Sequence, residues 1–479
     1  MTIGSWFAVL ALAGCQRAET PSPAPLPDIL LVVEDTVRAD ALGPYGAARP
    51  TAPQLTLIAE AGVLFEDVTA PGSWTWPSHA SLFTGVYPWE HGAHFALPDD
   101  PESWSLSPTP FTVHMPRADL PTLAEQLAAA GYRTVSVSGN VLIGPDLPAM
   151  VRGFAASSTH ADDDAVVARA IQEMDAEGPL FLFVNLFGAH GPLALQPAPW
   201  TLGLPETLTP EAAPAWAQPF LDGTGVDLHA RPAPDMPFGP VAIASGQYPL
   251  PDEAWGLLRD LYDAEVLTVD RHLRDLVDAW GRRRPATGVV AVTSDHGEYF
   301  GERGLVEHGR TVYRPVLQVP LVIAAPGRIQ GGTRVKIPVE MHQLHDTLLA
   351  LAGLGGARSL LPLVGADPAK DPAVIRAAAW PDLYWARSGD ARFTQGYRHY
   401  REGRWALVLG TSGGVELFDL AADPLMEADV AMQHPEVVSR LKAAAEHAFD
   451  VPEGASYTRP LDVEGDLTER LRALGYMGD

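Results

Sequence analysis

The stretch "PDILLVVED", residues 27–35, combines a short apolar run with a terminal acid, and it decides the fold. Five consecutive apolar residues, Ile29 to Val33, are typical of a strand that is buried on both faces. The same pattern recurs in "PLFLFVNLFGAH" (179–190), "TGVVAVTSDHGE" (287–298) and "VPLVIAAPG" (319–327). Strands of this kind occur in sheets whose two faces are both covered by helices.

Segments with helical signals lie between these strands. The segment "TAPQLTLIAEAG" (51–62) has a proline early and a glycine at its end, and residues 255–280 carry apolar side chains at helical spacing. Residues 122–140 follow the order helix, turn, strand. Strands that alternate with helices predict an α/β fold with a large, mostly parallel sheet flanked by helices.

The pattern changes after about residue 355. Residues 392–410 and 415–423 are typical of antiparallel strands, and helices are expected around 435–449 and 466–474. We therefore expect a main α/β domain over residues 27–355 and a small α+β subdomain over residues 356–479, closed by those two helices.

Composition limits the classes of function. The chain has 479 residues, of which 47% are hydrophobic and 19% are charged, as in a globular protein. A net charge of -26 argues against a nucleic-acid partner, because phosphate backbones require a basic surface. An anionic substrate would have to be bound by local features such as a metal ion, a helix N-terminus or a few arginines.

The N-terminus predicts a membrane tether. Residues 1–15, "MTIGSWFAVLALAGC", form an apolar run that is too short to span a bilayer and that ends at Cys15, the single cysteine of the chain. This run resembles a bacterial lipoprotein signal, and the Pro-rich residues 16–26 would link a lipidated Cys15 to the main domain. The expected location is the bacterial cell envelope, lipid-anchored, on the periplasmic or extracellular side. The alternative is a chance free cysteine.

Chemically active side chains gather where the predicted strands end. Asp35, His190, Asp295 and His296 all occupy such positions, and in open parallel sheets ligands bind beyond the carboxyl ends of the strands. Asp and His side chains are suitable ligands for a divalent cation. Thr75, in "GSWTWPSHASLFTG" (72–85), is expected at the N-cap of a helix, where a hydroxyl beside a cation could become a nucleophile. The plainer interpretation of Thr75 is ordinary helix capping.

The chain resembles the sulfatase family of the alkaline phosphatase superfamily over nearly its whole length after the N-terminal segment. The matching blocks are "PDILLVVEDTVRADALGPYG", "TAPQLTLIAEAGVLFEDV", "WTWPSHASLFTGVYPWEHG", "TLAEQLAAAGYRT", "LYDAEVLTVDRHL", "TSDHGEYFGERG", "VPLVIAAPG", "VELFDLAADPLMEADVA" and "LRALGYMG". The resemblance implies that residues 27–355 form the catalytic domain. It also implies that Asp35, Thr75, Asp295 and His296 bind one metal ion and that Thr75 is the nucleophile.

The resemblance further implies roles for His190 and His308 in catalysis, at the leaving group or substrate, and for Arg310 in substrate binding. His79 and Asn140 occupy positions where the family has an arginine and a lysine that serve maturation and sulfate binding. We therefore expect both to face the substrate.

The departures from the family pattern concern sulfate chemistry. True sulfatases carry C-x-P-S-R or S-x-P-S-R and oxidise the first residue to formylglycine, whereas this chain has Thr75 in that position and His79 in place of the arginine. The family's "GKWHLG" is "GNVLIG" here, which replaces a lysine and a histidine by Asn140 and Leu142, and Thr36 replaces an acid. Further polar groups are expected to be lost at Asn185 and Gly188.

Threonine cannot form the second hydroxyl by which formylglycine releases sulfate, so a Thr75 adduct must be cleared by water or another acceptor. Threonine nucleophiles in this superfamily are typical of enzymes that act on phosphorus esters. The sequence thus favours a metal-dependent hydrolase of sulfate or phosphate esters, leaning towards phosphoesters or phosphodiesters, whose substrate is a small molecule, lipid or glycan ester. Alternatives are a phospho-headgroup transferase and a non-catalytic binding protein. His296 among the ligands slightly favours Zn²⁺ or Mn²⁺ over Ca²⁺ or Mg²⁺.

The tether generates a first prediction. In a bacterial host, Cys15→Ser should move the full-length protein from the membrane fraction to the soluble or unprocessed fraction, because the lipid attachment site is gone. Removal of residues 1–26 should leave a soluble, folded protein. Fractionation followed by immunoblotting measures both effects, and an unchanged membrane fraction for Cys15→Ser would contradict the lipoprotein assignment.

Overall fold

The computed structural model describes most of the chain. The described residues are 26–96, 112–175, 177–191, 193, 239–250, 252–284, 288–367, 373–381, 383–386, 388–452, 461–462 and 466–473. Cys15 and the predicted tether lie outside them, as does most of the segment between residues 193 and 239. Within these ranges, no helix combines the length and the apolar character needed to cross a membrane.

An eight-stranded sheet forms the centre of the main domain. In spatial order, its strands are β13 (Thr333–Val335), β2 (Val63–Phe65), β12 (Leu321–Ala324), β8 (Val289–Thr293), β1 (Ile29–Glu34), β7 (Leu180–Leu186), β5 (Arg133–Ser138) and β6 (Ala156–Thr159). β1 is parallel to both of its neighbours, β7 and β8, while β12 is antiparallel to β8 and β2. The prediction of a large, mostly parallel sheet is confirmed.

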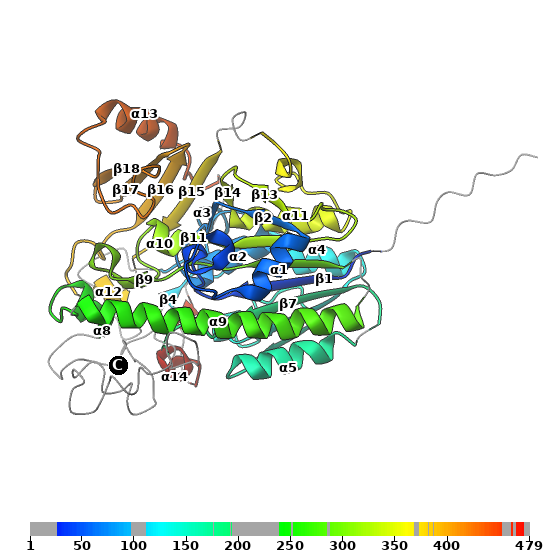
Figure 1. Cartoon of the computed structure of the whole chain (residues 1–479). Helices are drawn as coiled ribbons and strands as arrows, with labels where there is room; N and C mark the ends of the chain where they lie inside the picture. Colours follow the sequence, from blue (N-terminus) through cyan, green and yellow to red (C-terminus); the bar gives the residue numbers. More distant parts are fainter. Residues whose placement is uncertain are drawn as a thin grey trace, which may run out of the picture.

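Helices cover both faces of this sheet, as Figure 1 shows. Alternate residues of β1 enter different cores: Ile29 and Leu31 join one hydrophobic cluster, whereas Leu30 joins the other. The first cluster includes residues of α2 (Thr75–Thr84), α4 (Leu123–Ala129) and α11 (Leu344–Leu351). The second includes residues of α1 (Pro53–Ala61), α5 (Asp163–Glu173) and α9 (Asp252–Arg283). Burial on both sides explains why β1 needs an unbroken apolar run.

Several short elements lie around these parts. They are β3 (Val68–Thr69), β4 (Thr112–Val113), β9 (Tyr299–Phe300), β10 (Val306–Glu307), β11 (Gln318–Val319), β14 (Val339–Glu340), β19 (Leu461–Asp462), α3 (Pro88–His91), α8 (Gly239–Ala244), α10 (Arg314–Leu317) and α12 (Leu383–Ala386). Of these, β11, β3 and β14 form a separate three-stranded sheet. The side chain of Glu340, in β14, contacts the C-terminal subdomain.

The antiparallel strands predicted near the C-terminus are confirmed. They form a four-stranded sheet of β15 (Val374–Ala379), β16 (Tyr397–Glu402), β17 (Trp405–Gly410) and β18 (Val415–Asp419). α13 (Pro435–Ala445) packs on one face of this sheet. α14 (Asp466–Ala473) does not close the subdomain as expected: Leu471 is buried in a core cluster of the main domain, and Arg470 pairs with Asp146. Burial of the apolar Leu471 side chain in the core of the main domain stabilises this position of α14.

A buried polar joint, formed by Tyr87, Glu340 and Arg376, connects the four-stranded C-terminal sheet to the main domain. Tyr87 donates a hydrogen bond to Glu340 Oε2 (2.6 Å), and the backbone N–H of Arg376 donates to Glu340 Oε1 (2.7 Å). The Arg376 guanidinium lies over the Tyr87 ring, 4.3 Å from its centroid, and donates to the Tyr87 hydroxyl. Burial raises the pKa of Glu340 to about 7, against the opposing effects of Arg376 and Tyr87.

This joint predicts a pH dependence of stability. The folded protein retains a proton on Glu340 up to about pH 7, whereas the unfolded chain releases it near 4.5, so stability present at low pH is lost as pH rises through this window. The loss is on the order of 3 kcal/mol. Urea unfolding of wild type and Glu340→Gln at pH 4.5 and 8 should show a smaller decrease for the variant. Glu60→Gln, at an exposed site, should keep the wild-type decrease, and equal decreases in all three proteins would contradict the assignment.

Candidate metal centre and active site

Asp35 follows β1 directly and begins the site. Its backbone N–H donates to Leu186 O at the end of the neighbouring strand β7 (2.9 Å), which fixes the turn that aims the carboxylate along the sheet edge. Oδ2 accepts hydrogen bonds from the side chains of Asn140 (2.9 Å) and Asn185 (3.3 Å). Oδ1 is buried and has no hydrogen-bond partner among the described residues. One oxygen of Asp35 is therefore oriented by amides, and the other is available to a ligand.

Asp295 lies two residues beyond the end of β8 and faces Asp35. Its Oδ1 accepts hydrogen bonds from the backbone N–H groups of His296 (3.0 Å) and Thr36 (3.3 Å), while in the described part of the chain Oδ2 accepts none. Thr36 has a left-handed backbone with φ 59°, which is strained for a threonine. Because this conformation lets the Thr36 N–H reach Asp295, the strain is used to orient a site carboxylate.

His296 presents one ring nitrogen to the two carboxylates. Its Nδ1 lies 2.9 Å from the carbonyl oxygen of Gly297, so Nδ1 carries the proton and Nε2 is the nitrogen with a lone pair. Nε2 lies 3.3 Å from Asp295 Oδ2 and 3.6 Å from Asp35 Oδ1. Burial lowers the pKa of His296 despite the nearby Asp295, which favours the neutral imidazole that metals bind.

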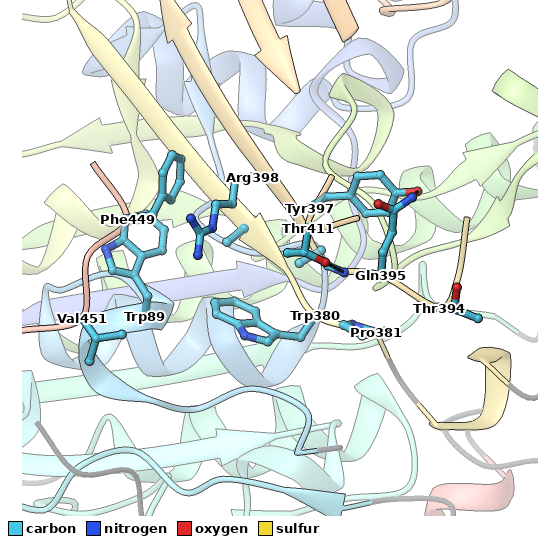
Figure 2. Close-up of a pocket in the computed structure, with 13 residues that line it drawn as sticks. Trp89, Trp380, Pro381, Thr394, Gln395, Tyr397, Arg398, Thr411, Phe449 and Val451 are labelled. Atoms are coloured by element: carbon cyan, nitrogen blue, oxygen red, sulfur yellow. Dashed lines mark hydrogen bonds between the residues drawn. The ribbon is translucent and has the colours of Figure 1, made fainter. Parts of the chain in front are cut away.

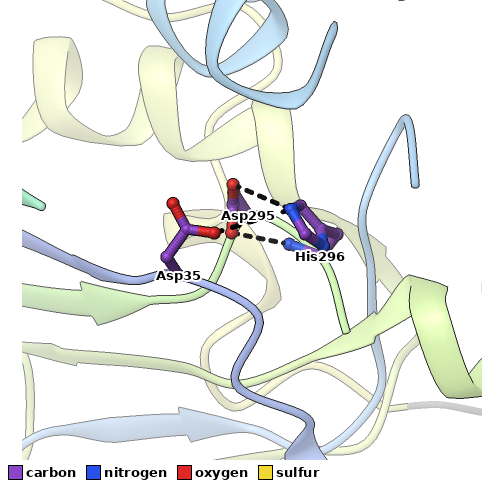
Figure 3. Close-up of side chains that lie close together, drawn as sticks. All are labelled: Asp35, Asp295 and His296. Atoms are coloured by element: carbon purple, nitrogen blue, oxygen red, sulfur yellow. Dashed lines mark hydrogen bonds and ion pairs between the residues drawn. The ribbon is translucent and has the colours of Figure 1, made fainter. Parts of the chain in front are cut away.

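These three side chains fit a divalent cation. Asp35, Asp295 and His296 are fully buried, and their ligand atoms lie within 4.8 Å of one another (Figure 3). The oxygens without hydrogen-bond donors, Asp35 Oδ1 and Asp295 Oδ2, belong to this group. Burial and the charge of Asp295 raise the pKa of Asp35 well above its usual range, while His296 and His79 outweigh burial and lower that of Asp295. A cation between the carboxylates would remove the repulsion that keeps Asp35 protonated.

Thr75 adjoins this cluster, but it is not the N-cap that the sequence predicts. α2 begins at Thr75, and the N-cap position belongs to Trp74, whose backbone is extended at φ -159° and ψ 168°. Thr75 therefore has helical backbone geometry, and its hydroxyl does not cap the helix. Instead, Oγ1 lies 3.3 Å from Asn140 Nδ2 and 3.4 Å from His296 Nε2. The structure thus places a buried hydroxyl beside the candidate metal ligands at the start of a helix.

Asn140 and Asn185 bridge the elements of the site. Asn140 follows β5 and caps a short 3-10 helix by accepting from Leu142 N–H (3.0 Å), which aims its Nδ2 at both Asp35 and Thr75. Asn185 lies in β7 opposite Val33, and its Oδ1 accepts from Ser138 (3.2 Å). The sequence comparison counted Asn185 as a lost polar group, but it orients Asp35. The signal that could reveal this role is a polar residue in an otherwise apolar strand.

Two further histidines lie next to His296. The ring of His308 is 4.3 Å from that of His296 and 5.0 Å from that of His190, measured between centroids. Glu298 Oε2 lies 3.1 Å from His308 Nδ1 and orients that ring. The structure therefore brings His190 and His308 to the predicted site. Glu298 is a supporting residue that the sequence reasoning missed.

Arg310 and His79 are placed differently from the residues above. Arg310 donates to the carbonyl of His308, pairs with Glu307 (3.5 Å) and lies over the ring of Trp385 (4.5 Å). The fully buried His79 has its Nδ1 3.3 Å from Asp295 Oδ2 and 3.1 Å from Thr75 O, so it contacts a candidate metal ligand. Substrate contacts for both residues, and for Asn140, stay predictions.

The sequence of this chain matches a known protein family. The family model described as Sulfatase matches residues 27–354. Among curated relatives, choline-sulfatase of Rhizobium meliloti is 30% identical over 176 residues, covering 35% of this chain and 32% of the relative. A sulfatase of Formosa agariphila is 27% identical over 254 residues, covering 51% and 45%. The matches thus span less than half the length of these two relatives.

Solved structures share the fold at low identity. Phosphonate monoester hydrolase of Agrobacterium radiobacter superposes with a TM-score of 0.63 at 19% identity, covering 92% of this chain and 100% of that chain. A structure solved with its substrate D-glucosamine-2-N,6-O-disulfate has a TM-score of 0.63 at 17% identity, covering 88% and 97%. The α/β fold with its large sheet is therefore shared with both proteins.

The site predicts the effect of removing one ligand. Asp295→Ala should lower metal affinity at least tenfold, because substitutions of groups that merely support metal ligands already cost about 10–100-fold. Elemental analysis and metal titration of wild type and variant measure this change. Asp119→Ala removes an exposed carboxylate paired with Arg117 and should leave affinity unchanged. Equal occupancy in the Asp295→Ala protein and the parent would rule out this metal site.

Proposed function

Because the chain belongs to the sulfatase family, we propose that it is a metal-dependent ester hydrolase that uses Thr75 as nucleophile and prefers phosphate esters to sulfate esters. Family membership supports the broader statement, a hydrolase acting on sulfate or phosphate esters. The finer proposal depends on one observation: the Thr75 hydroxyl lies within 3.4 Å of His296 Nε2, at the edge of a buried carboxylate pair.

The chain's own residues supply the parts of a nucleophilic displacement. Asp35, Asp295 and His296 would hold the cation, which when bound lowers the pKa of a nearby hydroxyl and polarises the ester. Thr75 contributes the attacking Oγ1 from the first turn of α2, where backbone N–H groups favour anions. Asn140 Nδ2 orients Thr75 Oγ1 and Asp35 together. The positive end of the helix and the amide thus favour a tetrahedral anion at this point.

The first half of the reaction joins Thr75 to the substrate. Thr75 Oγ1 gives its proton to solvent water and forms a bond to phosphorus, and the bond from phosphorus to the leaving oxygen breaks. The leaving oxygen takes a proton from His308 or His190, whose rings lie 5.0 Å apart beside the site. Glu298 holds the ring of His308 through Nδ1, so the opposite nitrogen of His308 is the one that can donate.

The second half must release the covalent adduct. Threonine carries one hydroxyl, so water attacks phosphorus and returns one proton to the histidine that protonated the leaving oxygen. The bond to Thr75 Oγ1 breaks, and Thr75 takes a proton from solvent water. The residues that replace the family's sulfate contacts support the phosphorus preference: Asn140 is engaged with Asp35 and Thr75, and Leu142 is fully buried. Phosphorus chemistry on this fold is named for two structural neighbours, the phosphonate monoester hydrolases of Agrobacterium radiobacter and Silicibacter pomeroyi.

The proposal includes a substrate class, a cellular location and a metal ion. A small-molecule or glycan ester is the proposed substrate class, and two structural neighbours are named with sugar ligands, a disulfated glucosamine and a neocarrahexaose. Lipid attachment at Cys15 in the bacterial envelope remains part of the proposal and awaits the fractionation experiment. The cation is one divalent ion, with Zn²⁺ or Mn²⁺ favoured by the imidazole ligand.

Substitution of the nucleophile tests the mechanism. Thr75→Ala should lower turnover by orders of magnitude, because no hydroxyl remains to form the adduct, while Thr75→Ser should keep partial activity. Alanine is a strong helix former, so the fold should be retained. Thr84→Ala is the matched control, since it removes a buried hydroxyl from the same helix that bonds only to Ala80 O among the described residues. Undiminished kcat in Thr75→Ala would refute the nucleophile.

The substrate preference is tested separately. Wild type should show higher kcat/KM on nitrophenyl phosphate monoesters or diesters than on nitrophenyl sulfate, because threonine lacks the formylglycine route for releasing sulfate. The three substrates share one chromophore and are compared at equal metal loading. A higher kcat/KM for the sulfate would overturn the phosphoester preference and leave the broader assignment intact.

A further inference from the structure

A cavity of about 440 Å³ lies at the edge of the C-terminal sheet, apart from the metal centre. Trp89, Trp380, Arg398 and Phe449 line it together with the polar side chains of Gln395 and Thr411 (Figure 2). None of Asp35, Thr75, Asp295 and His296 lines this cavity. A ligand bound here would therefore contact different residues from those proposed for hydrolysis.

The packing of the sheet explains why the cavity exists. Across the strands, Arg398 of β16 is opposite Ala378 of β15 and Leu409 of β17. The neighbouring row on the same face, Tyr400 and Leu407, is buried in the cluster that α13 covers. Arg398 is exposed although it lies on the same face, two positions along the strand. The cavity thus forms where the cover of the sheet ends.

The charge of the cavity is opposite to that of the protein. The chain has a net charge of -26, yet none of the 13 lining residues is acidic, and Arg398 is cationic. Other arginines of this sheet pair with carboxylates, as Arg401 does with Asp67 and Arg404 with Asp419. In the described part of the chain, Arg398 has no carboxylate partner and lies over the Phe449 ring at 5.5 Å.

The positive charge extends beyond this cavity. A second hollow shares Arg398 and Thr411 with it and adds Lys442, one of three lysines in the whole chain. Of the described residues that line this hollow, none is acidic. Two adjoining cavities with only positive charges, on a strongly acidic protein, favour an anionic ligand through local electrostatic complementarity.

The aromatic side chains provide rigid surfaces. Trp380 stacks on His94 with centroids 4.2 Å apart and planes 1° apart, and Trp89 stacks on Tyr87 at 4.5 Å and 10°. Both indoles are thus fixed before a ligand binds, which reduces the entropy lost on binding. Figure 2 shows the Arg398 guanidinium among the rings of Trp89, Phe449 and Trp380. The C–H face of a sugar ring packs well on an indole, while its hydroxyls bond to amide and hydroxyl groups.

We propose that this cavity binds a sugar ring that carries a carboxylate, sulfate or phosphate group, with the anion on Arg398 and the ring against Trp380. A guanidinium bonds such groups through two parallel N–H donors, which gives geometric specificity as well as attraction. Gln395 and Thr411 line the same cavity and would meet the sugar hydroxyls through the hydrogen-bonding capacity left beside their contacts with Ser412, Tyr397 and Gly396. This site is independent of the proposed hydrolysis.

Four probes test the site: the methyl glycosides of glucuronate, glucose 6-sulfate and glucose 6-phosphate, and neutral methyl glucoside. Binding is followed by saturation-transfer NMR and tryptophan fluorescence in the Thr75→Ala background, which is designed to prevent turnover. At least one anionic probe should bind saturably and at least tenfold more tightly than methyl glucoside. Arg398→Gln should remove that advantage, and Trp380→Ala should weaken binding of both the anionic and the neutral sugar. Arg404→Gln is the matched control, because Arg404 lies in the turn between β16 and β17, outside the cavity.

Two outcomes would overturn the proposal. One is that none of the three anionic probes binds saturably; the other is that Arg398→Gln binds them as well as the Arg404→Gln control does. A third measurement separates this site from the metal centre: methyl glucuronide should bind equally well after Asp295→Ala. Binding that is lost in Asp295→Ala but retained in Arg398→Gln would place the probe at the metal centre. The proposed hydrolysis can fail without affecting any of these results.

Discussion

The structure depends on two carboxylates, Asp35 and Asp295, that face each other in the buried interior. Burying one ionised carboxylate is costly, and burying two side by side adds their mutual repulsion. Hydrogen bonds partly offset this cost: the Asn140 and Asn185 amides donate to Asp35, and two backbone N–H groups donate to Asp295. Even so, burial and Asp295 raise the pKa of Asp35 well above its usual range. A divalent cation would neutralise the remaining negative charge of the two carboxylates. The loops at this edge of the sheet are therefore arranged to hold the site.

Much of the fold and part of the site could be predicted from the sequence. Apolar runs identify the central strands, and the carboxyl ends of parallel strands share one edge, which brings Asp35 near Asp295 and His296. The strand ends also indicated His190, the expected helix start indicated Thr75, and the family resemblance added His308; the roles of all three stay predictions. The strands and the placement of Asp35, Asp295 and His296 could be predicted because they depend on burial and chain direction, which a local pattern records.

The errors arise where long-range packing decides. Trp74 takes the N-cap position from Thr75 because its backbone is extended, and no local residue preference indicates this. The role of Asn185 depends on the register of β7 against β1, which places it next to Asp35. The docking of α14 depends on Leu471 reaching the core of the main domain. None of these is encoded by spacing within one segment.

The site is assembled from distant parts of the chain, since Thr36 and Asp295 are bonded across a separation of 259 residues. Such contacts form late in folding, because a long loop must close before they contribute. An incomplete chain that ends before β8 lacks two of the three candidate ligands, Asp295 and His296. A metal ion would therefore bind only after the whole sheet has been synthesised. Its binding would add to the folding free energy of complete molecules and not to that of partial ones.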